Sequence, residues 1–335
     1  MSGDCKVTLE KLPPNNSRSY VGADFVELLA MFSIDREVSR SDVLQWVARG
    51  KDTGAFEEDP ETLATTNAQE TRVDDWFRHI EYRIKIFADS YPFRLTHDRN
   101  TLSFISGMSP KNKIYIFMLA ASNLWAVDRS CRTRLTGIFE VLSKEALKIY
   151  LPQNAEVFLF GKGASNSDSP FTGTNVEKLQ TLAEFIHEDL VCEPSNFMPH
   201  DSGDSGLDVV GWIPFGDEVP GTAVFFGQCA CGLEWNEKQG TVTRDHWRTY
   251  LTAKNLMSGM LFCSRLLRDS NGSWYEPHKI KTIVIDRLRI AKLFDRRWPE
   301  EKEMVSVYEM VDLFMSPDNI LPLAAITNTV FFAQN

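Results

Sequence analysis

The sequence predicts a mainly α-helical N-terminal domain followed by an α/β domain in which helices flank a mixed sheet. Before Pro152, apolar residues recur mostly at helical spacing. After Pro152, short runs rich in β-branched and aromatic residues alternate with amphipathic segments, which is typical of a sheet covered by helices. A Gly-, Ser- and Asn-rich stretch follows the first of these runs. We therefore expect two domains, at residues 1–152 and 153–335.

Helices are expected over most of residues 20–150. The clearest pattern is that of Val73, Trp76 and Ile80, which share one helical face. No catalytic motif occurs in this half, so we expect it to sense a trigger, bind a partner protein or form a homodimer. The segments expected outside its helices are a loose arm at 1–19, an acidic loop at 50–70 and a strand pair that turns at Asp98–Asn100.

The second half alternates strands and helices. A helix beginning near Asn175 has Thr174 or Asn175 itself as its N-cap. Strands are expected at 155–160, 207–213, 222–230, 259–267 and 280–286, and helices at 175–190, 245–256, 287–297 and 303–315.

Composition restricts the classes of function. The chain has 335 residues and a formal net charge of −10, so no global field attracts it to nucleic acid. Its six cysteines are irregularly spaced, which favours a reducing, cytoplasmic setting over a disulfide scaffold. The N-terminus has no signal-peptide pattern, and the longest apolar run, near 113–127, is too short to span a bilayer. We therefore expect no membrane association.

One stretch is basic, although the chain as a whole is acidic. Residues 279–297 contain seven Lys or Arg residues against two Asp residues. On a helix, Arg289, Lys292 and Arg296 share a face, which predicts contacts with DNA phosphates. The alternative is an ordinary solvated helix face. The predicted DNA-binding residues are Arg287, Arg289, Lys292 and Arg296.

Two polar side chains mark the ends of neighbouring strands. Asp208 begins one strand, and Gln228 ends the next after a single Pro/Gly turn. In a hairpin these two side chains would meet at one end of the sheet. A carboxylate with an amide oxygen is a hard ligand set suited to Mg²⁺. The pair therefore predicts a site for Mg²⁺ or Mn²⁺ that could act on a phosphoryl group.

The stretch "SGDSGLDVVGW" followed by "VFFGQCACG" resembles the PD-(D/E)XK nuclease superfamily, and within it the Mrr-like restriction endonuclease branch. Gly203, Asp204, Gly206 and Asp208 match the glycine–aspartate part, and Gln228 matches the start of the second part. The resemblance covers roughly residues 174–263 and implies a restriction-endonuclease-like sheet flanked by helices. It also implies that Asp208 and Gln228 hold the metal and that Asp204 supports them. An acid of the preceding helix, Glu184 or Glu188, would complete the site, and Glu184 is taken as the candidate.

The chain departs from the family at one position. The lysine expected two residues after Gln228 is replaced by Ala230. Lys238 or Lys254 would have to supply the missing ammonium, and Lys238 is preferred. The resulting hypothesis is a Mg²⁺-dependent endonuclease that hydrolyses phosphodiester bonds in DNA, in prokaryotic restriction or antiphage defence. If neither lysine reaches the site, the domain is a catalytically inactive module for DNA binding or assembly.

The cysteines leave a third alternative open. "GQCACGLEW" is superficially similar to papain-type segments, and His246 or His278 would serve as the base of a cysteine hydrolase. Papain-type nucleophiles begin a helix, however, whereas Cys229 and Cys231 end an apolar strand. A single C-x-C pair also falls short of the two ligand pairs typical of structural zinc.

Overall fold

The computed structural model describes residues 5–9, 11–14, 16–49, 60–161, 168–192 and 203–320. The chain divides into two compact units. Unit 1 contains residues 1–132, 267–275 and 307–335, and unit 2 contains residues 133–266 and 276–306. The division therefore differs from a single boundary at Pro152. It falls within α5 (Arg129–Tyr150), whose second half packs on the sheet of unit 2, and the segment 267–275 returns to unit 1.

Unit 1 consists of helices around a small sheet. Its three strands are antiparallel in the order β1-β3-β2. The predicted strand pair with its turn at Asp98–Asn100 is confirmed as β2 and β3. The elements in chain order are α1 (Ser19–Phe32), β1 (Glu37–Ser39), α2 (Arg40–Arg49), α3 (Pro60–Phe87), η1 (Ala88–Ser90), β2 (Phe93–Leu95), β3 (Thr101–Phe104), α4 (Pro110–Ser122), η2 (Leu124–Ala126) and η7 (Pro317–Asn319).

Part of the predicted loop at 50–70 is helical. The helix α3 begins at Pro60, a residue suited to the first turn because its missing N–H would have no helical partner there. The rest of that predicted loop lies outside the described residues. The helix packs on α1 at Gly22, where an added Cβ would lie 2.0 Å from the indole of Trp76. Because only glycine admits this approach, Gly22 and Trp76 fix how α1 and α3 cross.

A buried ionic cluster joins the same two helices. Arg83 of α3 is fully buried and lies 2.7 Å from both Asp24 and Glu27 of α1. The hydroxyls of Tyr91 and Tyr115 donate to Glu27, and burial raises the pKa of Tyr91 well above its usual value. Tyr91 therefore remains a donor, and every charge of the cluster is hydrogen-bonded.

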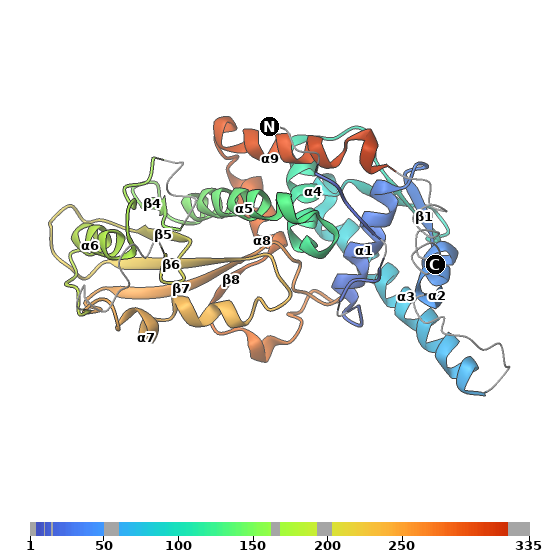
Figure 1. The fold of residues 1–335 in the computed structure, drawn as a ribbon, viewed down its shortest axis with the longest axis horizontal. Coiled ribbons are helices and arrows are strands. Elements are labelled where there is room, and N and C mark those ends of the chain that lie inside the picture. Colours follow the sequence, from blue (N-terminus) through green and yellow to red (C-terminus); the bar gives the residue numbers. More distant parts are fainter. Residues whose placement is uncertain are drawn as a thin grey trace. The chain divides into compact units, whose positions relative to one another are not determined.

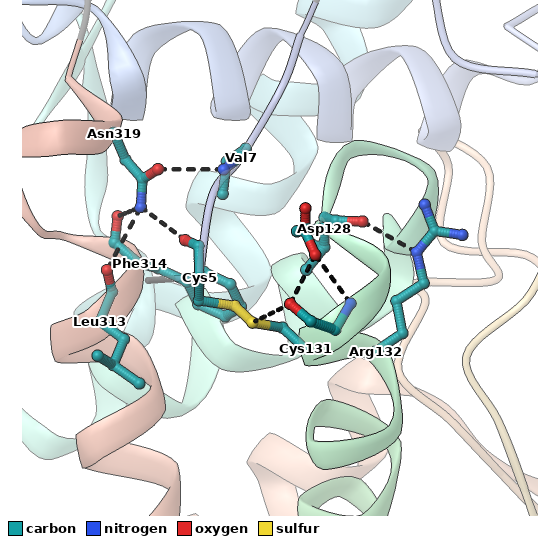
Figure 2. Close-up of a disulfide and its surroundings, with 10 residues drawn as sticks. Cys5, Val7, Asp128, Cys131, Arg132, Leu313, Phe314 and Asn319 are labelled. Carbon is teal, nitrogen blue, oxygen red and sulfur yellow. Dashed lines mark hydrogen bonds between the residues drawn. A yellow bond between two sulfur atoms is a disulfide. The ribbon is translucent and has the colours of Figure 1, made fainter. Parts of the chain in front are cut away.

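Residues 5–9 of the predicted loose arm are held in place by backbone and side-chain contacts. Val7 forms an antiparallel bridge with Val127, and Asn319 accepts from the Val7 N–H while donating to the Cys5 carbonyl (Figure 2). A disulfide joins Cys5 to Cys131 in the first turn of α5. The irregular cysteine spacing gives no sign of this pair, which the Val7–Val127 bridge brings together across 126 positions of the chain.

Unit 2 contains a five-stranded mixed sheet in the order β4-β5-β6-β7-β8. The pairs β4–β5 and β5–β6 are antiparallel, whereas β6–β7 and β7–β8 are parallel. The predicted α/β class is confirmed at this level. The elements are β4 (Glu156–Leu159), α6 (Asn175–Phe185), β5 (Val209–Trp212), β6 (Ala223–Ala230), η5 (Glu237–Val242), α7 (Arg244–Trp247), β7 (Leu256–Cys263), η6 (Pro277–Lys279), β8 (Ile283–Ile285), α8 (Arg287–Arg296) and α9 (Glu301–Phe314), which continues into unit 1.

Helical elements cover both faces of this sheet. On one face, Leu147 of α5 would meet a Cβ added to Gly211 at 3.2 Å, so the glycine lets the helix lie close to β5 (Figure 1). On the other face, Val210 and Phe226 of the strands pack with Leu182 of α6 and Trp247 of α7 in one buried cluster. The ring of Trp247 stacks on Phe226 with centroids 4.4 Å apart.

The predicted helix at 245–256 is wrong in length. Only Arg244–Trp247 is helical, because Leu251 leaves the helix to bridge Leu190 and the Thr252 N–H donates to the Asp189 carbonyl. The helix at 175–190 likewise ends at Phe185, although its predicted cap at Thr174 is confirmed by a capping box with Glu177. None of the helices in the described ranges combines the length and apolar character needed to cross a membrane.

Candidate functional site

Asp208 and Gln228 meet as the sequence predicts. Val209 pairs with Gly227 in the antiparallel ladder, so Asp208 lies opposite Gln228 at the same end of the sheet. The amide Nε2 of Gln228 donates to Asp208 Oδ2 at 2.7 Å, and the backbone N–H of Cys229 donates to the same oxygen at 2.7 Å. Two short hydrogen bonds therefore hold one oxygen of the Asp208 carboxylate.

Gln228 uses both ends of its amide in hydrogen bonds, and its predicted role as a metal ligand stays a prediction. Its Nε2 faces Asp208, and its Oε1 accepts from the hydroxyl of Thr241 at 3.1 Å. An amide nitrogen that donates a hydrogen bond has no lone pair for a metal. In this arrangement the amide nitrogen of Gln228 helps to hold the Asp208 carboxylate in position.

A second carboxylate turns toward the same place. Asp204 accepts from the Gly206 N–H through Oδ1 at 2.9 Å. Its other oxygen, Oδ2, lies 3.4 Å from the position that a Cβ would occupy on Gly161. Oδ1 of Asp208 lies 3.3 Å from that position, and the Leu207 carbonyl lies 3.5 Å from it. Each carboxylate therefore has one oxygen held by N–H donors and presents the other beside the open side of a glycine.

Gly161 is not among the residues that the sequence predicts for the site. A glycine in a loop has no side chain to indicate a role, and only the fold places it beside Asp204 and Asp208. The signal available in the sequence is its position directly after the predicted strand at 155–160.

The environment of Asp208 disfavours its charged form. Burial raises the pKa of Asp208 from 3.8 to about 6. The Cys229 N–H and the charge of Lys238 lower this pKa, and the charge of Asp204 raises it. The carboxylate is nevertheless mainly ionised at neutral pH. A cation between Asp208 and Asp204 would relieve both the desolvation and the mutual repulsion of the two acids.

Lys238 lies at the end of β6, where the sequence predicts it. It belongs to η5, and its Nζ donates to the Cys229 carbonyl at 2.8 Å while the side chain remains largely exposed. Its charge acts on Asp208. Lys254, the other candidate, instead pairs with Asp189 at 2.5 Å. The ammonium that acts on Asp208 therefore comes from η5, whereas the position where the resemblance predicts a lysine is Ala230.

The glycine–aspartate loop is shaped by contacts with neighbouring elements. Gly206 has a φ of 75°, and an added Cβ would lie 2.5 Å from the Cβ of Thr241. Lys178 of α6 donates to the Gly203 carbonyl at 3.2 Å, and Asn175 accepts from Ser205 at 3.1 Å. The start of α6 and the end of η5 thus hold the loop that carries Asp204 and Asp208.

Glu184 is not brought to this group. It is exposed on α6, and the charges that act on Asp208 are those of Lys238 and Asp204. Glu188 is buried, but its carboxylate accepts from Thr252 and from the Asn255 N–H, which is a structural role. The acid that α5 contributes near the site is Glu140, which acts with Asp208 on the thiol of Cys229. The predicted assignment of a helix acid to α6 is therefore wrong.

The cysteines at the strand ends are poor nucleophiles. Burial, with the nearby charges of Asp208 and Glu140, raises the pKa of Cys229 well above its usual value, and burial raises that of Cys231 to about 12. His246 is committed to the Ser205 carbonyl at 3.0 Å. These thiols stay protonated, which argues against a cysteine hydrolase.

Of the four predicted DNA-binding residues, one is buried and three are exposed. Arg287 is fully buried, and its Nε donates to the Ser264 carbonyl at 2.8 Å, so it cannot contact DNA. Arg289, Lys292 and Arg296 are exposed on α8, although Arg289 also donates to the Val284 carbonyl at 2.5 Å. The prediction for Arg287 is wrong because the first residue of α8 faces the end of β7.

Within the described part of the chain, no group of three or more His, Cys, Asp or Glu side chains is arranged to hold a metal ion. The oxygen set beside Gly161 has two carboxylates and a backbone carbonyl, a combination that suits Mg²⁺ with retained waters. Comparisons of the chain with protein-family models, with curated proteins and with solved structures found no match.

Proposed function

We propose that unit 2 is a metal-dependent nuclease domain that hydrolyses phosphodiester bonds in DNA. The observation that carries the proposal is the convergence of Asp204 and Asp208 beside Gly161, with Lys238 at the same end of the sheet. Carboxylate oxygens and an ammonium are the groups that phosphodiester hydrolysis with Mg²⁺ requires.

Each residue has a distinct part in this proposal. Asp204, Asp208 and the Leu207 carbonyl would hold Mg²⁺ or Mn²⁺, which when bound supplies Lewis acidity and lowers the pKa of a bound water. Gln228 keeps Asp208 in position through its Nε2 donor. Lys238 offsets negative charge on the phosphate, since its exposed ammonium can turn from the Cys229 carbonyl to a substrate oxygen.

The topology supports a place in the PD-(D/E)XK superfamily. The motif strands β5 and β6 are antiparallel neighbours, as a hairpin carrying the motif requires, and helical elements flank the sheet. By the same resemblance, we propose prokaryotic restriction or antiphage defence in the cytoplasm as the setting. The three exposed cations of α8 are proposed to contact the DNA backbone.

A second candidate function rests on the small number of metal ligands. Among the described residues, two carboxylates converge beside Gly161, and the Gln228 amide nitrogen donates to one of them. A domain of this kind that binds DNA without cutting it would serve as an assembly module.

A plasmid cleavage assay separates the two. The full chain is incubated with supercoiled DNA in Mg²⁺, Mn²⁺ or EDTA, alongside the variants Asp208→Ala and Lys238→Ala. The matched controls are Glu184→Ala, an exposed acid, and Lys254→Ala, a lysine outside the site. The proposal expects metal-dependent nicking that both site variants lose and both controls keep.

Three results would contradict the nuclease proposal. Retained nicking in Asp208→Ala would show that cleavage does not use this site. DNA binding without nicking in any metal would favour the inactive module. Cleavage lost in Cys229→Ala but kept in Asp208→Ala would instead restore a role for the thiol.

A further inference from the structure

Unit 1 has the element order of a winged helix-turn-helix. Three helices and three strands follow in the order α1, β1, α2, α3, β2, β3, and the strands pair in the order β1-β3-β2. In this arrangement α2 and α3 correspond to the two helices of a helix-turn-helix, and the β2–β3 hairpin stands beside them. The arrangement follows from the strand order alone and does not depend on unit 2.

Specific contacts bring the hairpin turn, α2 and α3 onto one surface. Arg99 in the turn donates to Glu81 of α3 at 2.9 Å and is 67% exposed. Arg40, the first residue of α2, donates to the Arg99 carbonyl at 3.1 Å and pairs with Asp74 of α3. The turn of the hairpin therefore lies alongside α3.

We propose that this surface of unit 1 binds double-stranded DNA, with α3 directed into the major groove and the hairpin on the adjacent backbone. The inference rests on the proposed function, because a nuclease needs a means of choosing its DNA. It assigns target recognition to unit 1 and leaves hydrolysis to unit 2.

The hairpin supplies the groups that contact phosphates. Arg94 of β2 is exposed on the outer face of the sheet, and His97 and Arg99 lie in the turn. Arg99 is held by an exposed ion pair, which contributes little free energy and can exchange a carboxylate for a phosphate. The same applies to Arg78 of α3, which is 63% exposed and pairs with Asp75.

The exposed part of α3 supplies groups suited to base edges. Thr66, Asn67 and Thr71 are exposed, and Gln69 is partly exposed. Amides can pair with adenine in the major groove, and hydroxyls can bond to either kind of base pair. The acids of the helix, Asp74 among them, are largely held by arginines and so oppose DNA less than their number suggests.

Fluorescence anisotropy with a duplex of about three helical turns, in EDTA, tests binding apart from cleavage. The variant Arg94→Ala/Arg99→Ala is compared with Lys6→Ala/Arg129→Ala, which removes two exposed cations of unit 1 elsewhere. We expect the first variant to lose about tenfold in affinity and to reduce the salt slope of log Kobs by about 2, and the control to behave as wild type. Glu81→Gln should change affinity in the opposite direction, because it releases Arg99.

Three outcomes would overturn the inference. One is an unchanged affinity and salt slope in the Arg94/Arg99 variant, and another is an absence of duplex binding by the wild type. The third is a lower molar mass of the Arg94→Ala/Arg99→Ala variant in light scattering, with its DNA binding unchanged. That result would show that the surface binds a second copy of the chain. Binding is measured in EDTA and cleavage in a separate assay, so the two proposals can fail independently. If the hairpin variant loses DNA binding but the wild type never cleaves DNA in any metal, the proposed nuclease is refuted and this inference stands.

Discussion

Replacement of Asp208 by asparagine should remove the proposed nuclease activity and yet stabilise unit 2. Asparagine can keep both hydrogen bonds, since its Oδ1 can accept from Gln228 and Cys229 as Asp208 Oδ2 does. Its Nδ2 would then face Asp204, replacing a repulsion between two carboxylates by a hydrogen bond. The variant therefore removes the buried charge without creating an unsatisfied group.

The expected gain follows from the pKa of Asp208. Its folded value of about 6 lies above the ordinary 3.8, so the folded state binds the proton more tightly than the unfolded state. The associated stability is fully present below pH 3.8 and is lost as the pH rises through 6. The difference of about 2 pKa units corresponds to about 3 kcal/mol at pH 8. Hydrogen bonds to a neutral acceptor are weaker by about 1 kcal/mol, which leaves a net gain of about 1–2 kcal/mol.

Urea unfolding at pH 8 and at pH 4 measures this gain. The unfolded fraction of unit 2 is followed by pulsed hydrogen exchange and mass spectrometry of peptides from β5 and β6. The free energy of unfolding of Asp208→Asn should exceed that of wild type at pH 8, and the difference should shrink as the pH falls to 4. Mg²⁺ at about 100 times its Kd should stabilise wild type by about 2.7 kcal/mol and leave the variant unchanged.

The reasoning would be refuted by a variant that is less stable than wild type at pH 8. Such a result would mean that the ionised carboxylate is a net stabilising partner of Lys238 and the Cys229 N–H. A gain of equal size at both pH values would also refute it, because the effect would then not depend on the charge of Asp208.

Three further predictions concern other positions. Gly161→Ala should weaken Mg²⁺ binding, measured by calorimetry, while leaving the circular dichroism spectrum unchanged, because its Cβ would lie 3.3 Å from Asp208 Oδ1; unchanged Mg²⁺ affinity would place the cation elsewhere. Gly22→Ala should lower the melting temperature of unit 1 by several degrees, since the added Cβ would lie 2.0 Å from Trp76, and a neutral effect in differential scanning calorimetry would contradict the described packing. Arg287→Met should lower the free energy of unfolding in a urea titration without changing the salt slope of DNA binding, because Arg287 is buried. Lys292→Ala should change the salt slope and leave stability unchanged. A changed salt slope with unchanged stability in Arg287→Met would contradict the burial of Arg287.

Local patterns in the sequence predict much of unit 2. The antiparallel hairpin follows from two apolar runs around one turn, and its register brings Asp208 and Gln228 together as expected. The sequence predicts the N-cap of α6 at Thr174 or Asn175, and the structure has Thr174 in a capping box with Glu177. These features depend on residues near one another in the chain, so spacing and residue type are enough to predict them.

Other features depend on contacts between distant segments, which the sequence does not display. The disulfide between Cys5 and Cys131 joins residues 126 positions apart. The helix α7 is short because the chain after it, at Leu251, pairs with Leu190 after α6. The burial of Arg287 results from the packing of α8 against the end of β7. Periodicity indicates which residues share a helix face, but not which neighbour covers that face.

At the candidate site, residue identity suggests the chemistry, and the tertiary structure decides which side chains contact one another. The glycine–aspartate stretch and Gln228 indicate a hard-ligand site from the sequence alone. Only the fold turns Gln228 into a donor to Asp208, brings Asp204 and Gly161 beside it, and places Lys238 at the strand end that Ala230 leaves without a cation. The physical reason is that hydrogen-bond direction and burial depend on every element packed around a side chain, and these elements come from four separate parts of the chain.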